Sequence, residues 1–128
     1  MSAMSDYLEN EILDHILGTG AYTMPSNVYI GLSTGSFSDD NSGTELSGSG
    51  YARQAITFAA ASSASAATNA TVTFPTATGS WGAVSNWGLF DASSSGNLLI
   101  HGAFASSKTI ASGDVLRVNS GDLTVTAA

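Results

Sequence analysis

The chain carries few residues that could do acid–base or nucleophilic chemistry. Its 128 residues include two histidines, His15 and His101, ten carboxylates and no cysteine. Enzymes that move protons or cleave bonds need acids, bases and nucleophiles that converge on one reacting atom. The sequence has no Gly-X-Ser-X-Gly elbow, phosphate-binding glycine loop, dinucleotide fingerprint or His-Glu-X-X-His helix. We therefore predict that the protein is not an enzyme and has no catalytic, cofactor-binding or metal-binding residues.

The two histidines are predicted to be structural. His101 lies in the apolar run of residues 99–103, which is typical of a strand, so we expect its ring to be held by a hydrogen bond. His15 lies near the end of the first apolar stretch and is expected at the surface. Neither histidine has a sequence neighbour of the kind that would complete a catalytic set.

The loop that begins at Gly35 and ends at Gly50 concentrates hard oxygen ligands. The run Asp39-Asp40-Asn41-Ser42-Gly43, followed by Glu45, offers the carboxylate and amide oxygens that calcium prefers. The run lacks the alternating ligand pattern of an EF-hand, and aspartate, asparagine and glycine build solvated loops without any ion. We predict a solvated acidic loop, with calcium binding as the alternative.

Three aromatic residues offer a second kind of site. Tyr51, Trp81 and Trp87 would stack on sugar rings if they lined one face of a β-sandwich. Trp87 lies in the apolar run 84–90 and is predicted to belong to the core, whereas Trp81 stands among glycine and serine residues and is predicted to lie on a loop. Carbohydrate binding therefore remains as an alternative that depends mainly on Trp81.

The charge balance argues against two classes of partner. The net charge is −7, and the three basic side chains, Arg53, Lys108 and Arg117, lie far apart in the sequence. Nucleic acids and anionic membranes bind clustered lysines and arginines, so we expect neither as a partner. No apolar run approaches the length of a membrane span, and residues 1–14 lack the basic start and apolar core of a secretion signal. We expect synthesis in the cytoplasm.

Arg53 is the basic residue with the clearest predicted role. It stands in the block Tyr51-Ala52-Arg53-Gln54, which opens a predicted strand in a chain with only 10% charged residues. We expect an acidic partner for Arg53. A solvated arginine at the end of the strand is the alternative, because surface ion pairs contribute only about 0–1 kcal/mol.

One helix is predicted within residues 1–20. Asp6 and Glu9 fit a capping box at its start, and Gly18 and Gly20 fit a stop. The helix either covers the core of its own domain or acts as an arm that docks on a neighbouring subunit, and the sequence leaves both open. The apolar residues that recur at helical spacing are Leu8, Ile12, Leu13, Ile16 and Leu17.

Residues 27–128 change to the alternating pattern of β-strands and predict a mainly β fold. Seven or eight short strands with regular turns indicate one jelly-roll-like β-sandwich domain that spans residues 1–128. The turns at 111–114 and 119–122 are predicted to close tight hairpins, and residues 35–50 and 59–69 are predicted to be loops. The predicted core comprises Ile30, Leu32, Ile56, Phe58, Val72, Phe74, Leu89, Phe90, Leu99, Ile100, Phe104, Leu116, Leu123 and Val125.

The order of short sequence blocks carries further information. In this order, and nearly end to end, the blocks resemble a family of small bacteriophage virion structural proteins that are often labelled tail-fibre proteins. The blocks are residues 7–15, Val28-Tyr29-Ile30-Gly31-Leu32, Glu45-Leu46-Ser47-Gly48 leading into Gly50-Tyr51-Ala52-Arg53-Gln54, Val72-Thr73-Phe74-Pro75, Trp81-Gly82, Trp87-Gly88-Leu89-Phe90-Asp91-Ala92, Gly96-Asn97-Leu98-Leu99 and Ser112-Gly113-Asp114.

The resemblance implies a structural protein that acts through assembly in the virion. We favour a capsid decoration (cement) protein, a homotrimer that binds the major capsid protein between capsomers, because the chain has no repeat or heptad that would build a long shaft. The low content of charged residues suits surfaces that become buried against a partner. The alternative is a tail-fibre or tail-tip component, including an adhesin that binds carbohydrate.

Overall fold

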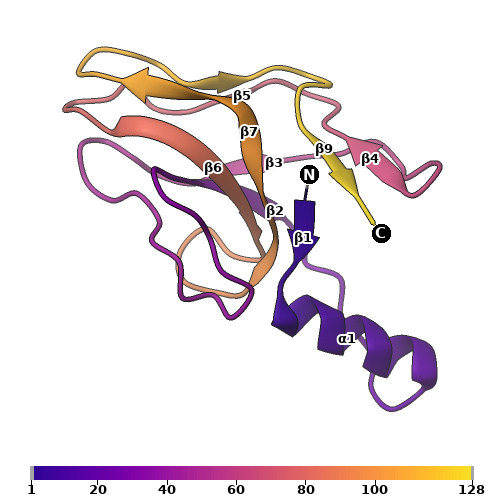
Figure 1. The fold of residues 1–128 in the computed structure, drawn as a ribbon. Coiled ribbons are helices and arrows are strands. Elements are labelled where there is room, and N and C mark those ends of the chain that lie inside the picture. The colour runs from indigo at the N-terminus through magenta and orange to yellow at the C-terminus, as the bar shows by residue number, and fades with distance from the viewer. Residues whose placement is uncertain (1, 128) are drawn as a thin grey trace.

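The structure, a computed structural model, describes residues 2–127 as one helix and nine strands (Figure 1). The predicted mainly β fold with one N-terminal helix is confirmed, and every strand pair is antiparallel. In chain order the elements are β1 (Ser2–Met4), α1 (Asp6–Leu17), β2 (Val28–Ser33), β3 (Gln54–Ile56), β4 (Ser65–Ala67), β5 (Val72–Thr73), β6 (Gly82–Phe90), β7 (Leu98–Ile110), β8 (Arg117–Val118) and β9 (Thr124–Thr126).

Five strands form the main sheet, in the order β1-β7-β6-β2-β3. The long strands β6 and β7 pair along their whole length, from Gly82 opposite Ile110 to Phe90 opposite Leu98, with two irregularities in the register. β2 lies on the other side of β6. The apolar runs of β2, β6 and β7 suit these inner positions, because central strands bury residues on both faces.

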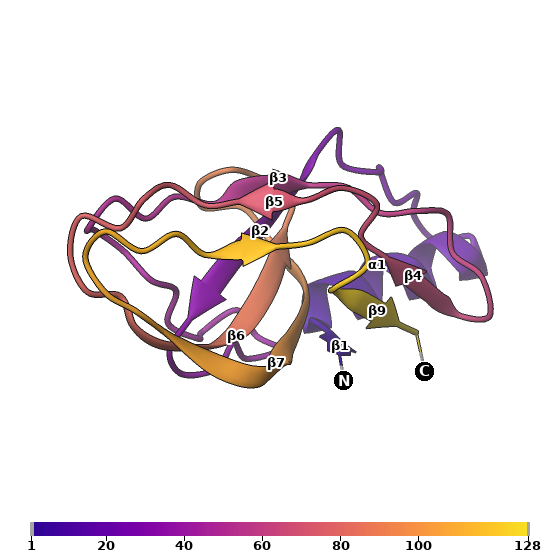
Figure 2. The same ribbon diagram turned by 90° about the horizontal axis from the view of Figure 1, so that it is seen from above.

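Two short ribbons, β4-β9 and β5-β8, lie opposite one face of this sheet and complete a β-sandwich (Figure 2). The main core fills the space between them, with Ile30, Leu32 and Val84 fully buried on the sheet side. The ribbon side contributes Phe74 and Val118, which are also buried. Burial of such side chains supplies most of the favourable free energy of folding.

The opposite face of the sheet is covered by the loop of residues 35–50. Phe37 from this loop packs edge-on against Phe90 at a ring separation of 5.7 Å and forms a second small core with Leu98. Gly88 makes this contact possible, because a Cβ atom there would lie 3.2 Å from the Phe37 ring and 3.0 Å from Leu98 Cδ1. The loop therefore packs directly on the strand backbone.

The N-terminal segment differs in two ways from the prediction. Ser5, not Asp6, caps α1, since its Oγ accepts from the Leu8 amide and also donates to the Leu98 carbonyl. Residues ahead of the helix form β1, which pairs with the edge of β7 and which the sequence did not predict. The predicted stop is confirmed at Gly18, which has the left-handed φ of 80°. No helix among residues 2–127 is long and apolar enough to cross a membrane.

Both predicted hairpins are wrong in their pairing, although the turns are correct. The turn at 111–114 does not fold β8 back on β7, because residues after the turn bond to residues 74–77 instead, as in Phe74 N to Leu116 O. The turn at 119–122 likewise leads to β9, whose partner is β4. Strand pairing is thus non-local in this half of the chain.

Residues 59–69, predicted as a loop, contain β4 and the tip of a hairpin. The Ala59 amide bonds to the Ala67 carbonyl, and Ser62 and Ser65 exchange backbone bonds. Ser63 and Ala64 turn the chain with φ values of 52° and 60°. The prediction failed because alanine and serine give no apolar alternation, whereas strand pairing needs only the backbone.

The predicted core is confirmed for most of its members. Phe58, Ile100, Phe104 and Val125 are half-buried and pack against the core, and the other ten predicted residues are buried. Buried apolar residues outside the prediction are Leu8, Phe37, Ala77, Trp81, Val84, Leu98, Ile110 and Val118.

Candidate functional site

The densest polar cluster of the described molecule surrounds Arg53, just before β3. Its guanidinium grips the Glu45 carboxylate at two points, with Nε 2.9 Å from Oε2 and Nη2 2.7 Å from Oε1. Nη1 donates to the carbonyl oxygens of Ala92 and Ser95, at 2.9 and 2.7 Å. The guanidinium carbon also lies 3.6 Å from the centre of the Phe90 ring, in a cation–π contact.

Tyr51 completes this cluster, which we call the Arg53 cluster: Glu45, Tyr51, Arg53 and Phe90. The Tyr51 hydroxyl donates to Glu45 Oε2 and accepts from the backbone amide of Leu32 on β2. Burial, followed by the hydrogen bond to the Glu45 carboxylate, raises the pKa of Tyr51 above its usual value of 10.0. The hydroxyl is therefore a permanent donor at neutral pH.

A glycine on β2 makes room for the cluster. At Gly31 a Cβ atom would lie 2.7 Å from Glu45 Oε2, 3.0 Å from the Phe90 ring and 3.1 Å from the Tyr51 hydroxyl. Such distances are too short for any side chain, so the cluster sits directly on the strand. It joins the loop of residues 35–50, the start of β3 and the turn of residues 91–97 to the main sheet.

The chemistry of this cluster is structural. Arg53 shares its donors among Glu45 and two carbonyls, and the Glu45 carboxylate is held by Arg53 and Tyr51, so both charged groups are bound within the chain. The prediction of an acidic partner for Arg53 is confirmed, and the alternative of a solvated arginine is wrong, because its side chain is only 8% exposed. The open hollow beside it, about 320 Å³, is lined mainly by serines and by the cluster itself.

The acids of the loop of residues 35–50, for which calcium binding was the alternative, point to different partners. Glu45 binds Arg53, Asp39 binds His101 and Asp40 accepts from the Ser42 amide at 3.0 Å. Hydrogen bonding from the Ser42 side chain, followed by that from its amide, lowers the pKa of Asp40. Within residues 2–127 no three histidine or acidic side chains lie close enough together to hold a metal ion. The structure therefore gives no support to the calcium alternative.

The aromatic residues weighed for sugar binding are packed inside the molecule. Trp81 lies outside the strands, as predicted, but it is buried and its Nε1 donates to the Ser49 carbonyl at 2.9 Å. Its ring packs edge-on against Tyr51 and Phe74, and Trp87 is also buried. The two tryptophan rings offer no open face for stacking, so the structure gives no support to a sugar site built on them.

Both histidines take the predicted structural places. His101 lies on β7, and its Nε2 is 2.7 Å from Asp39 Oδ1, a contact that ties the loop of residues 35–50 to the sheet. His15 is exposed on α1, where its Nδ1 accepts from the Tyr22 amide at 3.2 Å. The Asp6 amide bonds to the Asp39 carbonyl, which links the same loop to the start of the helix.

α1 leaves three large apolar side chains exposed. The predicted helix was expected to cover the core of its own domain or to dock on a neighbouring subunit. Only Leu8 of α1 is buried in this chain, whereas Leu13, Ile16 and Leu17 are exposed. The helical spacing gave the correct element but not the direction of its apolar stripe. An apolar groove of about 410 Å³ lies next to the same segment, between residues 22–28 and β4, β7 and β9.

Nearly the whole chain matches the model of a known protein family. A family model described as podophage GP4 fiber I protein gp80 matches residues 3–126. The matched residues include α1, the Arg53 cluster and every described strand, except for Ser2 at the start of β1. None of the curated proteins is similar enough to match the chain.

Proposed function

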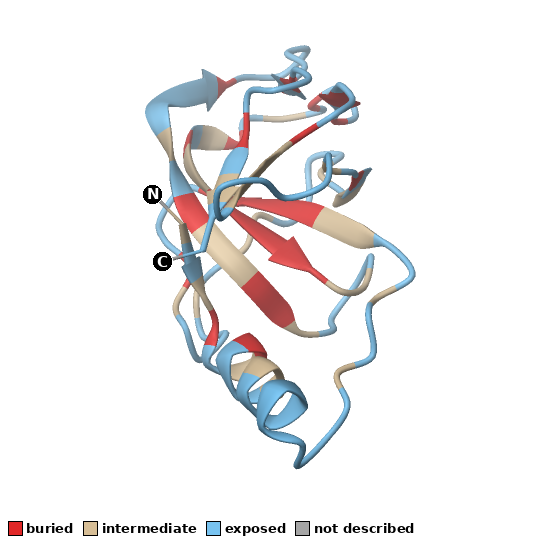
Figure 3. Ribbon diagram, turned by 90° about the vertical axis from the view of Figure 1, so that its right-hand side faces the viewer, coloured by how far each residue is buried: buried red, intermediate tan, exposed pale blue. Residues whose placement is uncertain are grey.

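Because the chain belongs to the podophage GP4 fiber I protein family, we propose that it is a non-enzymatic structural subunit of a phage fibre that works by binding copies of itself and neighbouring virion proteins. One observation carries the assembly role. Leu13, Ile16 and Leu17 are 55, 71 and 71% exposed, and Figure 3 shows α1 exposed along most of its length. Large apolar side chains that gather at a surface mark sites of protein contact.

The internal use of the polar residues supports a passive role. Arg53, Glu45, Tyr51 and the pair His101–Asp39 all hold loops against the sheet. A rigid module of this kind presents fixed surfaces to its neighbours, which lowers the ordering cost of association.

A fibre attached to the tail is the location that the family description supports. Capsid decoration, as a homotrimer on the major capsid protein, is the second candidate. It is supported by the shape of the fold, since the described strands turn back on one another and none of them extends into a shaft (Figure 1). Both locations demand the same property, a surface that binds other virion proteins.

Stoichiometry on purified particles separates these locations. We expect the protein to co-purify with tails after heads and tails are separated, at a copy number that matches the number of fibres. A copy number that scales with the capsid lattice, in the head fraction, would instead establish decoration. Absence of the protein from both fractions of intact particles would overturn the virion role altogether.

A further inference from the structure

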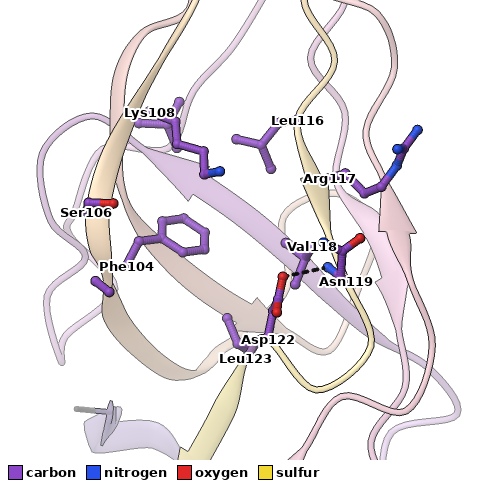
Figure 4. Close-up of a pocket in the computed structure, with 11 residues that line it drawn as sticks. Phe104, Ser106, Lys108, Leu116, Arg117, Val118, Asn119, Asp122 and Leu123 are labelled. Carbon is purple, nitrogen blue, oxygen red and sulfur yellow. Dashed lines mark hydrogen bonds between the residues drawn. The ribbon is translucent and has the colours of Figure 1, made fainter.

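A cavity of about 210 Å³ opens between β7 and the segment that carries β8 and the start of β9 (Figure 4). Its floor is apolar, formed by Phe104, Leu116, Val118 and Leu123. Its rim is polar and includes Lys108 on one side and Arg117 on the other. We call this the Lys108–Arg117 pocket. An apolar floor with a charged rim is the usual composition of a protein contact site.

Lys108 brings positive charge to the rim on an acidic molecule, whereas the Arg117 guanidinium points away from the floor residues (Figure 4). The chain has three basic side chains against ten acidic ones, and Arg53 is already neutralised by Glu45. Within residues 2–127 neither Lys108 nor Arg117 takes part in an ion pair, and the Arg117 Nε donates only to Thr73 Oγ1, at 3.3 Å. The nearby Asp122 carboxylate accepts from the Asn119 amide at 3.1 Å and closes its own turn.

The outward side of α1 has the complementary composition. Asp6, Glu9, Leu13 and Ile16 follow one another at spacings of three or four residues, and Leu17 follows Leu13 at a spacing of four, so the five form one stripe along the helix. All five are exposed, whereas Leu8, on the other side of the helix, is buried. The stripe therefore has an acidic half and an apolar half, which we call the α1 stripe.

The α1 stripe and the pocket lie at opposite ends of the molecule. In Figure 1 α1 forms the lower end, whereas the turns on either side of β8 lie at the upper end. The helix is held in its place by the pairing of β1 with β7 and by Ser5. A helix fixed in this way reaches the pocket only of another copy.

We propose that the α1 stripe of one copy docks in the Lys108–Arg117 pocket of a second copy. Apolar side chains from the stripe fill the floor, and its acids approach Lys108. This inference rests on the self-association proposed above and assigns its surfaces. Each copy offers one stripe and one pocket, so the contact is heterologous and joins copies head to tail, in a closed ring or in a row.

Sedimentation velocity of the full-length chain tests the apolar half. Leu17→Ser weakens self-association by at least about tenfold if a buried leucine is lost from the contact. Met24→Ser is the matched control, because Met24 is 80% exposed but lies outside the stripe. The inference is wrong if Leu17→Ser associates like the wild type, or if the wild type stays monomeric at all concentrations.

Charge exchange tests the acidic half. The double variant Lys108→Glu with Arg117→Glu, and the single variant Glu9→Lys, each associate poorly alone because like charges meet. A mixture of the two forms mixed oligomers, detectable by native mass spectrometry, since each pocket then meets a helix of opposite charge. If the mixture associates no better than its components, the docking is wrong. Incorporation of the same variants into particles, measured separately, shows whether the virion role survives that result.

Discussion

Arg53 is the side chain on which most of the loop packing depends. Arg53→Ala leaves the half-buried Glu45 carboxylate without its cation and frees the carbonyls of Ala92 and Ser95. We expect the free energy of unfolding to fall by roughly 3 kcal/mol, since removal of one partner from a buried pair strands the other charge. Arg53→Lys restores only part of this loss, because lysine lacks the planar fork.

Denaturant unfolding measures both variants. Arg117→Ala serves as the control, because Arg117 is exposed and its loss costs less than about 1 kcal/mol. Equal losses for Arg53→Ala and Arg117→Ala would contradict the central role of the Arg53 cluster.

The ionisation of Tyr51 makes the free energy of unfolding depend on pH in the alkaline range. Since the folded state raises the pKa of Tyr51 above 10.0, it holds this proton more tightly than the unfolded chain does. The contribution of Tyr51 is therefore complete below about pH 10 and is lost as the pH rises further. We expect the free energy of unfolding to fall above that pH, and to fall less steeply in Tyr51→Phe. The same slope in both proteins would assign the loss to other groups.

At the scale of elements, Ser5 fixes where the helix begins. Its side chain is buried and bonds both to the Leu8 amide and to the Leu98 carbonyl on β7. Ser5→Ala is expected to lower the free energy of unfolding by about 1–2 kcal/mol, because the helix cap and the donor to the buried Leu98 carbonyl are both lost. Ser26→Ala, at an exposed loop position, is the control and should change little. If Ser5→Ala left the free energy of unfolding unchanged, the pairing of β1 with β7 alone would position α1.

The contact between β2 and the loop of residues 35–50 depends on Gly31, which has no side chain. Gly31→Ala places a Cβ atom against Glu45, Tyr51 and Phe90, and we expect a loss of about 1–3 kcal/mol from overpacking. At Gly35 the nearest atom to an added Cβ is 3.8 Å away, so Gly35→Ala should stay within about 0.5 kcal/mol of the wild type. Thermal unfolding compares the two, and a reversed order would contradict the tight approach at Gly31.

Sequence patterns predicted the elements better than their partners. The alternation in β2 and the apolar runs of β6 and β7 identify strands because these side chains must be buried. Pairing escaped prediction where it depends on the backbone, as in β1 and β4, or on distant residues, as between Phe74 and Leu116. For the site, the block around Arg53 indicated an ion pair, but Glu45 was placed in a solvated acidic loop because the sequence does not show which donor a carboxylate meets.

At the scale of the whole molecule, the first and last described strands lie beside each other. The Ser2 hydroxyl accepts from the Thr126 amide at 3.0 Å and donates to the Thr126 carbonyl at 3.2 Å. Residues 124 positions apart are thus in direct contact, and Figure 1 shows both ends of the chain on the same side of the sheet.

Because these two strands lie side by side, their ends can be joined by a linker and the chain can be opened at another position, as a circular permutant. A linker of about four residues, at up to ~3.5 Å each, spans the short gap between the ends. New ends opened between Ser63 and Ala64, at the exposed tip of the β4 hairpin, break no pairing within a strand. We expect this circular permutant to fold, with native-like circular dichroism and a cooperative thermal transition. Such a permutant would carry a fused peptide at the hairpin tip and leave the N-terminal helix in place.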